Sequence, residues 1–348
     1  MNGGMQMKKM LLMVMAVVFF MGMGEFSRAA AADQPIILKY AELAPKMVRT
    51  EAGMWWIDQV QKRTDGRVKI EYYPAESLVK ANDMPDAVRT KVCDIATFVT
   101  VYYPTKVPLW TIVDVGGVSD AYSVMMAALD LYKMEPAFQK ALDNWNCRLL
   151  FPQTSAGETI LVFRGNLNNL SDIKGKKIRA VGDQAILIKG LGGVPLPVTQ
   201  PEIFTALQTG TLDGALGFPS QAMSFAYFEV TKTWLRGAPG QYLVPAMINK
   251  DTWNKLPKDI QKIMDEVSVE QVKFLAHLMK TKEGEIIERV QNEKGIKVIN
   301  LTPGEIKTWK AQYGPIWEKW KKEASQKGAN GEKLLARYFE LCKKYGGE

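Results

Sequence analysis

The sequence has very little histidine and cysteine. It contains one histidine, His277, and three cysteines, Cys93, Cys147 and Cys342, in 348 residues. A serine-histidine-aspartate triad could use only His277, and no nucleophile-elbow motif accompanies it. Zinc sites need several histidines or a cysteine cluster, and the chain also lacks the glycine-rich loops that bind phosphates and dinucleotides. We therefore expect no catalytic residue, no metal site and no cofactor, so the protein is not expected to be an enzyme.

Long apolar runs are also rare, and the clearest one is at the N-terminus. Leu11–Met23 carries no charge, Lys8 and Lys9 precede it, and small residues follow up to Ala32. This pattern predicts a secretory signal peptide over residues 1–32, cleaved near Ala32. The run is short for a membrane span, and an uncleaved anchor is the alternative. We expect an exported protein, in an oxidising compartment where two of the cysteines could pair.

Charge of one sign is not concentrated in any segment. The chain has 45 lysines and arginines against 37 aspartates and glutamates, with a formal net charge of +8. Because the basic residues are spread among acidic ones, the pattern favours a solvated surface over a nucleic-acid-binding patch, and no nucleic-acid partner is expected. The mature part, residues 33–348, is too long for one ordinary core and predicts two lobes.

Strands and helices alternate along this mature part, which predicts an α/β fold. The clearest unit is Leu170–Phe218, with strands over 176–181, 194–198 and 213–218 and helices between them. The middle strand is short, apolar and bounded by prolines, as a buried parallel strand would be. A β-α-β-α-β unit of this kind has its ligand crevice at the carboxyl ends of the strands. Arg179 lies in the middle of the first strand, close to that end.

Other elements can be placed from their periodicity. A buried strand is predicted over Val92–Val99, a helix over Ser220–Val230, and a very long helix from Pro257 to about Asn292. A capping box, Thr302-Pro303-Gly304-Glu305, opens a further helix near the C-terminus. The aromatic residues that follow recur at helical spacing, which predicts a buried core face rather than a ligand cage. They are Trp309, Tyr313, Trp317 and Trp320.

Four segments resemble a known family in order and spacing. They are RTDGRVKIEYYPAESL at Arg63–Leu78, LSDIKGKKIRAVG at Leu170–Gly182, PEIFTALQTGTLDGA at Pro201–Ala215, and DTWNKLPKDIQKIM at Asp251–Met264. Over nearly its full mature length the chain resembles the extracytoplasmic solute-binding subunit of tripartite ATP-independent periplasmic (TRAP) transporters, the family of the C4-dicarboxylate-binding proteins.

The resemblance implies a two-lobed periplasmic-binding-protein fold, with a ligand cleft between the lobes and the long helix spanning both. By analogy, lobe I would comprise residues 33–156 and 244–282. Lobe II would comprise residues 157–243 and 283–348. The family captures an organic anion in the cleft, closes over it, and hands it to membrane permease subunits driven by a sodium gradient. This implies a periplasmic receptor, and we expect a monomer.

The resemblance also implies which residues bind the ligand. Arg179 matches the arginine that grips the ligand carboxylate, and a guanidinium suits that role because its planar fork forms two parallel hydrogen bonds to a carboxylate. The alternative for Arg179 is a surface arginine paired with a neighbouring acid. The other expected ligand-binding positions are Phe98, Val99, Tyr102, Tyr103, Thr159, Gly217 and Phe218. Trp110 is a further candidate for an aromatic wall, and core packing is the alternative for each aromatic residue.

This chain departs from the family pattern at several of these positions. Thr159 stands where many relatives carry a second arginine, and the nearest arginine is Arg164. Gly217 and Phe218 stand where relatives often keep a polar group. Each departure replaces a polar group by a less polar one. We therefore expect Arg179 to be the main polar anchor in an otherwise apolar cleft, which suits a hydrophobic or aromatic monocarboxylate better than a dicarboxylate or a sugar acid.

Two other functions compete with this hypothesis. The receptor of an ATP-driven importer would share the architecture, and would differ in the long hinge helix and in having an ATPase as a genomic neighbour. A secreted hydrolase built only on carboxylates, such as a glycosidase, is the second alternative. The sequence has no paired-carboxylate signature that would favour it.

Overall fold

The computed structural model of the protein describes residues 34–118, 120–154, 158–241 and 243–347. The predicted signal peptide, residues 1–32, lies outside the described residues. Within the described part of the chain, every helix is too short or too polar to cross a membrane.

The first sheet has five strands in the order β2-β1-β3-β10-β4. Strand β1 runs parallel to β3, whereas β10 runs antiparallel to both β3 and β4. The strands are β1 (Ile36–Ala41), β2 (Val68–Tyr73), β3 (Ile95–Thr97), β4 (Cys147–Phe151) and β10 (Ala246–Asn249). The helices of this part of the chain are α2 (Val48–Arg63), α3 (Met84–Arg89), α4 (Ala121–Met134), α5 (Pro136–Lys140) and α9 (Lys250–Lys255), with 3-10 helices η1 (Ala81–Asp83), η2 (Thr100–Tyr102), η3 (Pro108–Val115) and η4 (Asp143–Trp145).

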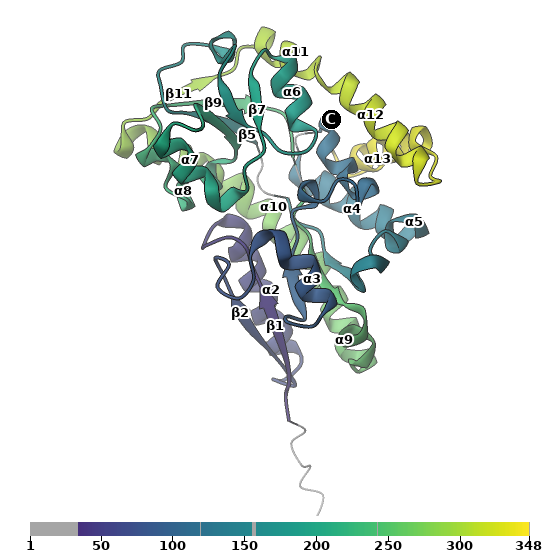
Figure 1. Ribbon diagram of the computed structural model, residues 1–348. Coiled ribbons are helices and arrows are strands. Elements are labelled where there is room, and N and C mark those ends of the chain that lie inside the picture. Colours follow the sequence, from purple (N-terminus) through teal and green to yellow (C-terminus); the bar gives the residue numbers. More distant parts are fainter. Residues whose placement is uncertain (1–33, 119, 155–157, 242, 348) are drawn as a thin grey trace, which may run out of the picture. The chain divides into compact units, whose positions relative to one another are not determined.

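The second sheet has six strands in the order β11-β9-β5-β8-β6-β7. Figure 1 labels β11, β9, β5 and β7 of this sheet. Its strands are β5 (Thr159–Phe163), β6 (Lys177–Arg179), β7 (Val194–Leu196), β8 (Gly214–Gly217), β9 (Thr233–Ala238) and β11 (Lys297–Asn300). The associated helices are α6 (Gln184–Gly190), α7 (Ile203–Thr209), α8 (Pro219–Ser224) and α11 (Pro303–Lys310), with 3-10 helices η5 (Leu170–Ile173), η6 (Gln200–Glu202) and η7 (Tyr227–Glu229). The two mixed sheets and their helices confirm the predicted α/β class.

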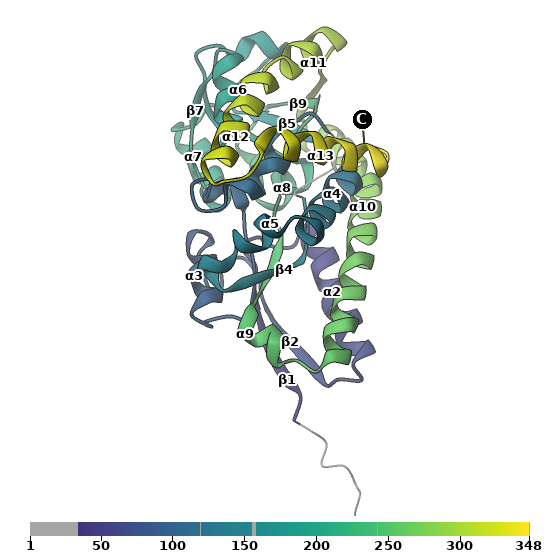
Figure 2. The ribbon, with the colours of Figure 1, turned by 90° about the vertical axis from the view of Figure 1, so that its right-hand side faces the viewer.

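The chain passes between the two sheets three times. It leaves the first sheet after β4, returns between β9 and β10, and leaves again along α10 (Lys258–Lys294) to reach β11. Helix α10 packs along α2, as Figure 2 shows, and also contacts α8. Two helices then end the chain: α12 (Tyr313–Gln326) packs on η3, and α13 (Gly331–Lys344) packs on α4. Each sheet therefore contains strands from parts of the chain that are far apart in the sequence.

Several predictions are confirmed: the long helix, the capping box and the buried aromatic residues near the C-terminus. Helix α10 covers the predicted long helix, and Thr302 and Glu305 form the predicted capping box before α11. Trp309, Tyr313 and Trp320 are buried, which confirms the predicted core face. Trp317 is half-buried and packs edge to face against Phe339, a residue of α13.

Other predictions are wrong in detail. Strand β7 is at the edge of its sheet, and Val194 is 45% exposed, so the middle strand of the central unit is not buried. The buried strand expected over Val92–Val99 is only Ile95–Thr97, because Val92 is still outside the core. The helix expected over Ser220–Val230 is broken where Ala226 adopts a left-handed conformation. Strands β9 and β11 were not predicted.

Candidate functional site

Arg179 ends strand β6 and is fully buried. Its register places it beside Leu196 of β7 and Ala215 of β8, both of which run parallel to β6. The guanidinium Nε donates to the carbonyl oxygen of Val198 at 2.9 Å, and Nη1 donates to that of Leu216 at 3.3 Å. Arg179 therefore bridges the backbone that follows β7 and the backbone of β8. This is the carboxyl edge of three parallel strands, where the sequence predicted the ligand crevice.

A second set of polar side chains, from α8 and η7, reaches the backbone that follows β7. The Gln221 amide Nε2 donates to the Tyr227 hydroxyl at 3.2 Å, and this hydroxyl donates to the Gln200 carbonyl oxygen at 3.0 Å. The Gln200 N–H in turn donates to the Tyr102 hydroxyl at 2.9 Å. Since Gln200 follows Val198 by two residues, this set of hydrogen bonds and the Arg179 Nε bond both end on the backbone that follows β7.

Tyr102 provides a contact between the first part of the chain and the central unit. Tyr102 ends η2, which follows strand β3 of the first sheet. Its hydroxyl accepts a hydrogen bond from the N–H of Gln200, which begins η6. Val101, its neighbour, lies against Gly182. A side chain at Gly182 would begin 3.1 Å from Val101 Cβ, and Gly182 has a φ of +55° that favours glycine. The predicted residue Val99 is buried at the start of η2.

Three other predicted aromatic residues pack in the core near the first sheet. The rings of Phe98 and Tyr103 both lie edge-on to Trp145, with centroids 5.7 and 5.2 Å away. The Tyr103 hydroxyl donates to the Ala81 carbonyl oxygen at 2.9 Å, and burial raises its pKa. Trp110 is buried and packs on Phe138, edge to face. These contacts are those of ordinary core packing, the alternative weighed for each of them.

The remaining predicted residues lie at the ends of β5 and β8. Gly217 ends β8, and Phe218, which is fully buried, precedes α8. Thr159 starts β5, and its hydroxyl donates to the Gly240 carbonyl oxygen at 2.7 Å. The expectation of an apolar neighbourhood beside Gly217 is wrong. A Cβ at Gly217 would lie 3.0 Å from Gln221 Oε1, so a polar amide occupies that space from four residues further along the chain.

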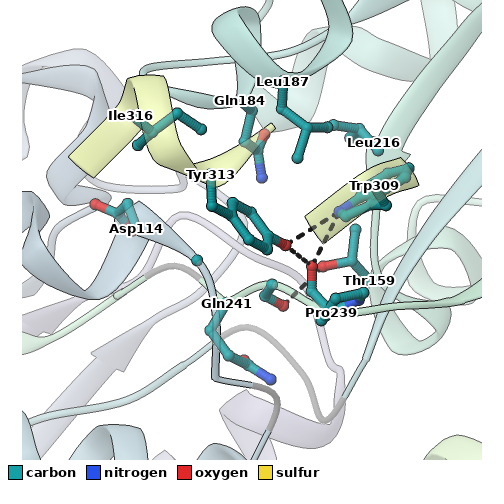
Figure 3. A pocket seen from close by; sticks show the side chains of 12 residues that line it. Asp114, Thr159, Gln184, Leu187, Leu216, Pro239, Gln241, Trp309, Tyr313 and Ile316 are labelled. Atoms are coloured by element: carbon teal, nitrogen blue, oxygen red, sulfur yellow. Dashed lines mark hydrogen bonds between the residues drawn. The ribbon is translucent and has the colours of Figure 1, made fainter. Parts of the chain in front are cut away.

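Thr159 also lines a small cavity of about 20 Å³, shown in Figure 3. That volume is enough for a single water molecule. Tyr313 is central in this view, and its hydroxyl donates to the Pro239 carbonyl oxygen, which also accepts from Trp309 Nε1 at 3.2 Å. Leu216 lines the same cavity with its side chain, while its carbonyl oxygen accepts from Arg179. In the conformation described, the cavity is therefore too small for an organic acid.

Two acidic side chains are buried near this cavity. Asp114 lines it, and its carboxylate accepts from the Leu243 N–H at 3.1 Å and the Thr100 hydroxyl at 3.3 Å. Burial raises the pKa of Asp114 well above its ordinary value. Burial also raises the pKa of Asp183, and the ion pair with Lys319 at 2.8 Å opposes that rise. Asp114 ties η2, through Thr100, to the returning segment that contains Leu243.

The sequence did not single out Gln221, Tyr227, Gln200 or Asp114 as site residues. Glutamine residues of a binding site have no characteristic spacing, and Gln200, Gln221 and Tyr227 lie on three different helices, η6, α8 and η7. Gln200 directly precedes the segment Pro201–Ala215 and Gln221 follows it by six residues, so position along the chain was the one signal for these two residues. His277 is exposed on α10, and the three cysteines are buried free thiols. Among the described residues, no three histidine, cysteine, aspartate or glutamate side chains gather as metal ligands would.

Comparisons with known proteins agree on one family. The sequence model of bacterial extracellular solute-binding protein family 7 (DctP) matches residues 41–323. A solute-binding protein of Albidiferax ferrireducens is 29% identical over 280 residues, which are 78% of this chain and 79% of that protein.

Solved structures give the same result. A TRAP solute-binding protein of Rhodoferax ferrireducens T118, in complex with copurified benzoate, aligns with a TM-score of 0.82 at 21% identity, over 89% of this chain and 98% of that one. A second one from Rhodoferax ferrireducens, with bound malonate, aligns with a TM-score of 0.76 at 25% identity, over 88% and 99%.

Proposed function

The chain belongs to bacterial extracellular solute-binding protein family 7, the solute-binding subunits of TRAP transporters, and from this membership we propose that Arg179 binds an organic carboxylate between two closing lobes. Proteins of this family are receptors of transporters and not enzymes. The receptor then delivers the acid to membrane permease subunits. It works as a monomer in the periplasm, after removal of residues 1–32. The lobes are 33–156 with 244–282, and 157–243 with 283–348.

The observation that carries this proposal is the placement of Arg179. Its guanidinium is fully buried at the carboxyl edge of β6, and two backbone carbonyl groups hold its plane. A fixed, desolvated guanidinium can bind a carboxylate through two parallel hydrogen bonds that are stronger than those on a surface. Since Arg179 is buried in this conformation, the acid enters when η2 and the central unit separate. The Tyr102–Gln200 hydrogen bond is one contact that such an opening breaks.

The finer proposal is a hydrophobic or aromatic monocarboxylate. Phe218 is buried directly after β8, and the β8 residue whose carbonyl group contacts Arg179 is a leucine. The Rhodoferax ferrireducens protein with copurified benzoate supports an aromatic acid, whereas the relative with bound malonate keeps a short dicarboxylate as the competing ligand class. Within the receptor class, the ATP-driven importer is less favoured because the matching family is that of the TRAP receptors.

Isothermal titration of Arg179→Met with benzoate and malonate tests the proposal. Methionine keeps much of the buried volume and removes the charge, so we expect binding to fall by more than about 100-fold, because charge-assisted pairs are the strong ones. Arg164→Met is the matched control, since Arg164 is exposed on the same sheet just after β5, and its variant should bind like wild type.

Two results would contradict the proposal. Unchanged affinity in a folded Arg179→Met variant would show that the Arg179 guanidinium does not bind the acid. If malonate bound and benzoate did not, the carboxylate clamp would stand and the aromatic monocarboxylate would be wrong. Thermal unfolding of each variant shows whether the fold is retained.

A further inference from the structure

Gln221 has a buried acceptor with no hydrogen-bond partner. Its side chain is fully buried in α8, and among the described residues no group donates to its Oε1 atom. A buried carbonyl oxygen without a donor costs free energy, because it has lost its hydrogen bonds to water. Gln221 Oε1 is one of several such buried atoms, and what sets it apart is its place at the carboxyl edge of the strands where Arg179 lies, so a partner that arrives with the ligand can satisfy it.

The hydrogen-bond network fixes which end of the Gln221 amide is the acceptor. The Tyr227 hydroxyl has one proton, and the Gln200 carbonyl oxygen accepts it at 3.0 Å. The same hydroxyl therefore has to accept from Gln221, and only the NH₂ group of the amide can donate, at 3.2 Å. If the amide were turned over, two acceptors would face each other. The Oε1 atom is thus left pointing away from Tyr227.

This acceptor lies on the same face of the sheet as the Arg179 side chain. Arg179 is in register with Ala215 across the parallel pair β6 and β8, so the two side chains point to the same face. Gly217 is two residues beyond Ala215 and shares that face because side chains alternate along a strand. Gln221 Oε1 lies 3.0 Å from the position that a Cβ of Gly217 would take. Arg179 Nη1 meanwhile contacts the carbonyl group of the preceding residue, Leu216.

From this placement we propose that Gln221 Oε1 accepts a hydrogen bond from the ligand, so that the bound acid carries a hydroxyl or N–H donor beside the carboxylate that Arg179 holds. The inference rests on the proposed function. It narrows the ligand from carboxylates in general to carboxylates with a donor group. Acids such as benzoate, phenylacetate and succinate have no such donor at neutral pH, and they leave the Gln221 acceptor unpaired when they bind.

Matched pairs of acids test this preference by isothermal titration. The pairs are 3-hydroxybenzoate with benzoate, mandelate with phenylacetate, and malate with succinate, which differ only by one hydroxyl group. We expect wild type to bind the hydroxyl-bearing member of at least one pair about tenfold more tightly, the size of one hydrogen bond to a buried acceptor. In Gln221→Met, which has similar volume and no acceptor, the two members of that pair should bind with similar affinity.

A second variant separates recognition from packing. Gln221→Glu keeps an acceptor at the same place and adds a negative charge near Arg179. It should weaken both members of the pair and retain the preference for the hydroxyl group. A variant that merely damaged the fold would instead weaken both members and lose cooperative thermal unfolding.

The outcomes distinguish the two proposals. A hydroxyl preference that disappears in Gln221→Met and persists in Gln221→Glu supports the role of Gln221. Binding without a hydroxyl preference in any pair, or a preference that Gln221→Met retains, overturns that role and leaves the carboxylate receptor standing. If wild type binds none of the six acids, the proposed function itself fails for these acid classes, and the role of Gln221 fails with it.

Discussion

Replacing Glu283 by glutamine should change how the stability of the protein depends on pH. Glu283 lies on α10 and is only 5% exposed. Its carboxylate accepts from the Ser220 N–H at 3.1 Å, and its other oxygen has no hydrogen-bond partner among the described residues. Burial, with a smaller contribution from the nearby Glu158, raises the pKa of Glu283 from 4.5 to about 7, although the hydrogen bond from the Ser220 N–H opposes this rise.

The sign of the effect follows from which state binds the proton more tightly. Below about pH 4.5 the carboxyl is protonated in the folded and the unfolded chain, and it adds no pH dependence. Between about pH 4.5 and 7 the unfolded chain loses this proton while the folded chain keeps it, so the free energy of unfolding falls as the pH rises. Above about pH 7 the folded chain carries the full cost of a buried charge. The difference between the two pKa values corresponds to about 3 kcal/mol.

Glutamine has nearly the same shape and can still accept from Ser220, but it stays neutral at every pH. Glu283→Gln should therefore match wild type within about 1 kcal/mol at about pH 5 and be more stable by about 3 kcal/mol at about pH 8. Urea unfolding of both proteins at both pH values measures this directly. Taking the difference between the two proteins cancels the titration of Asp114 and Asp183, which are common to both. A difference that is the same at both pH values would refute the reasoning.

Two further substitutions, each with a matched control, test the effects of burial and of close packing on stability. Arg49 is buried and donates to the Glu42 carboxylate through two hydrogen bonds of 2.8 Å. Arg49→Met leaves that carboxylate buried without its partner, so it should lower the free energy of unfolding by about 3–5 kcal/mol. The control Arg63→Met breaks an exposed ion pair with Glu270 and should lower it by less than about 1 kcal/mol. Equal losses in urea unfolding would contradict the importance of burial. Gly116 has a φ of +76°, and a Cβ there would lie 2.1 Å from an aromatic ring of α12, so Gly116→Ala should cost more than about 3 kcal/mol. Gly66→Ala, at a φ of +74° with open space around it, should cost only about 1 kcal/mol, and thermal unfolding compares the two.

Local sequence patterns predicted the elements that are long or strongly capped. The apolar period of α10 extends over ten turns, and the capping box at Thr302 is a purely local arrangement, so both were found from the sequence. Short strands were harder. Strand β7 has the composition of a buried strand, yet it is at the sheet edge because nothing pairs on its other side among the described residues. Strands β9 and β11 have weak patterns of their own and form because their partners provide the hydrogen bonds.

The candidate site was also predicted only in part from the sequence. Arg179 was identified because it lies in a segment whose residue types and spacing resemble one family, and its place at the end of β6 follows from local structure. The polar groups around it were not identified. Gln200, Gln221 and Tyr227 are on separate elements, and they form one hydrogen-bonded chain only after the sheet has brought those elements together.

The sequence by itself determined the α/β class, the family, the absence of catalytic histidine clusters and the arginine that is expected to hold a carboxylate. These conclusions depend on residue types and on their spacing along the chain, which are known without the tertiary structure. Only the tertiary structure decided that an amide, and not an apolar side chain, faces Gly217. That fact depends on where α8 packs against β8, and packing is set by contacts between segments that composition and periodicity do not describe. The Gln221 amide at the site could therefore be found only from the fold, whereas the charged residue, Arg179, could be found from the sequence.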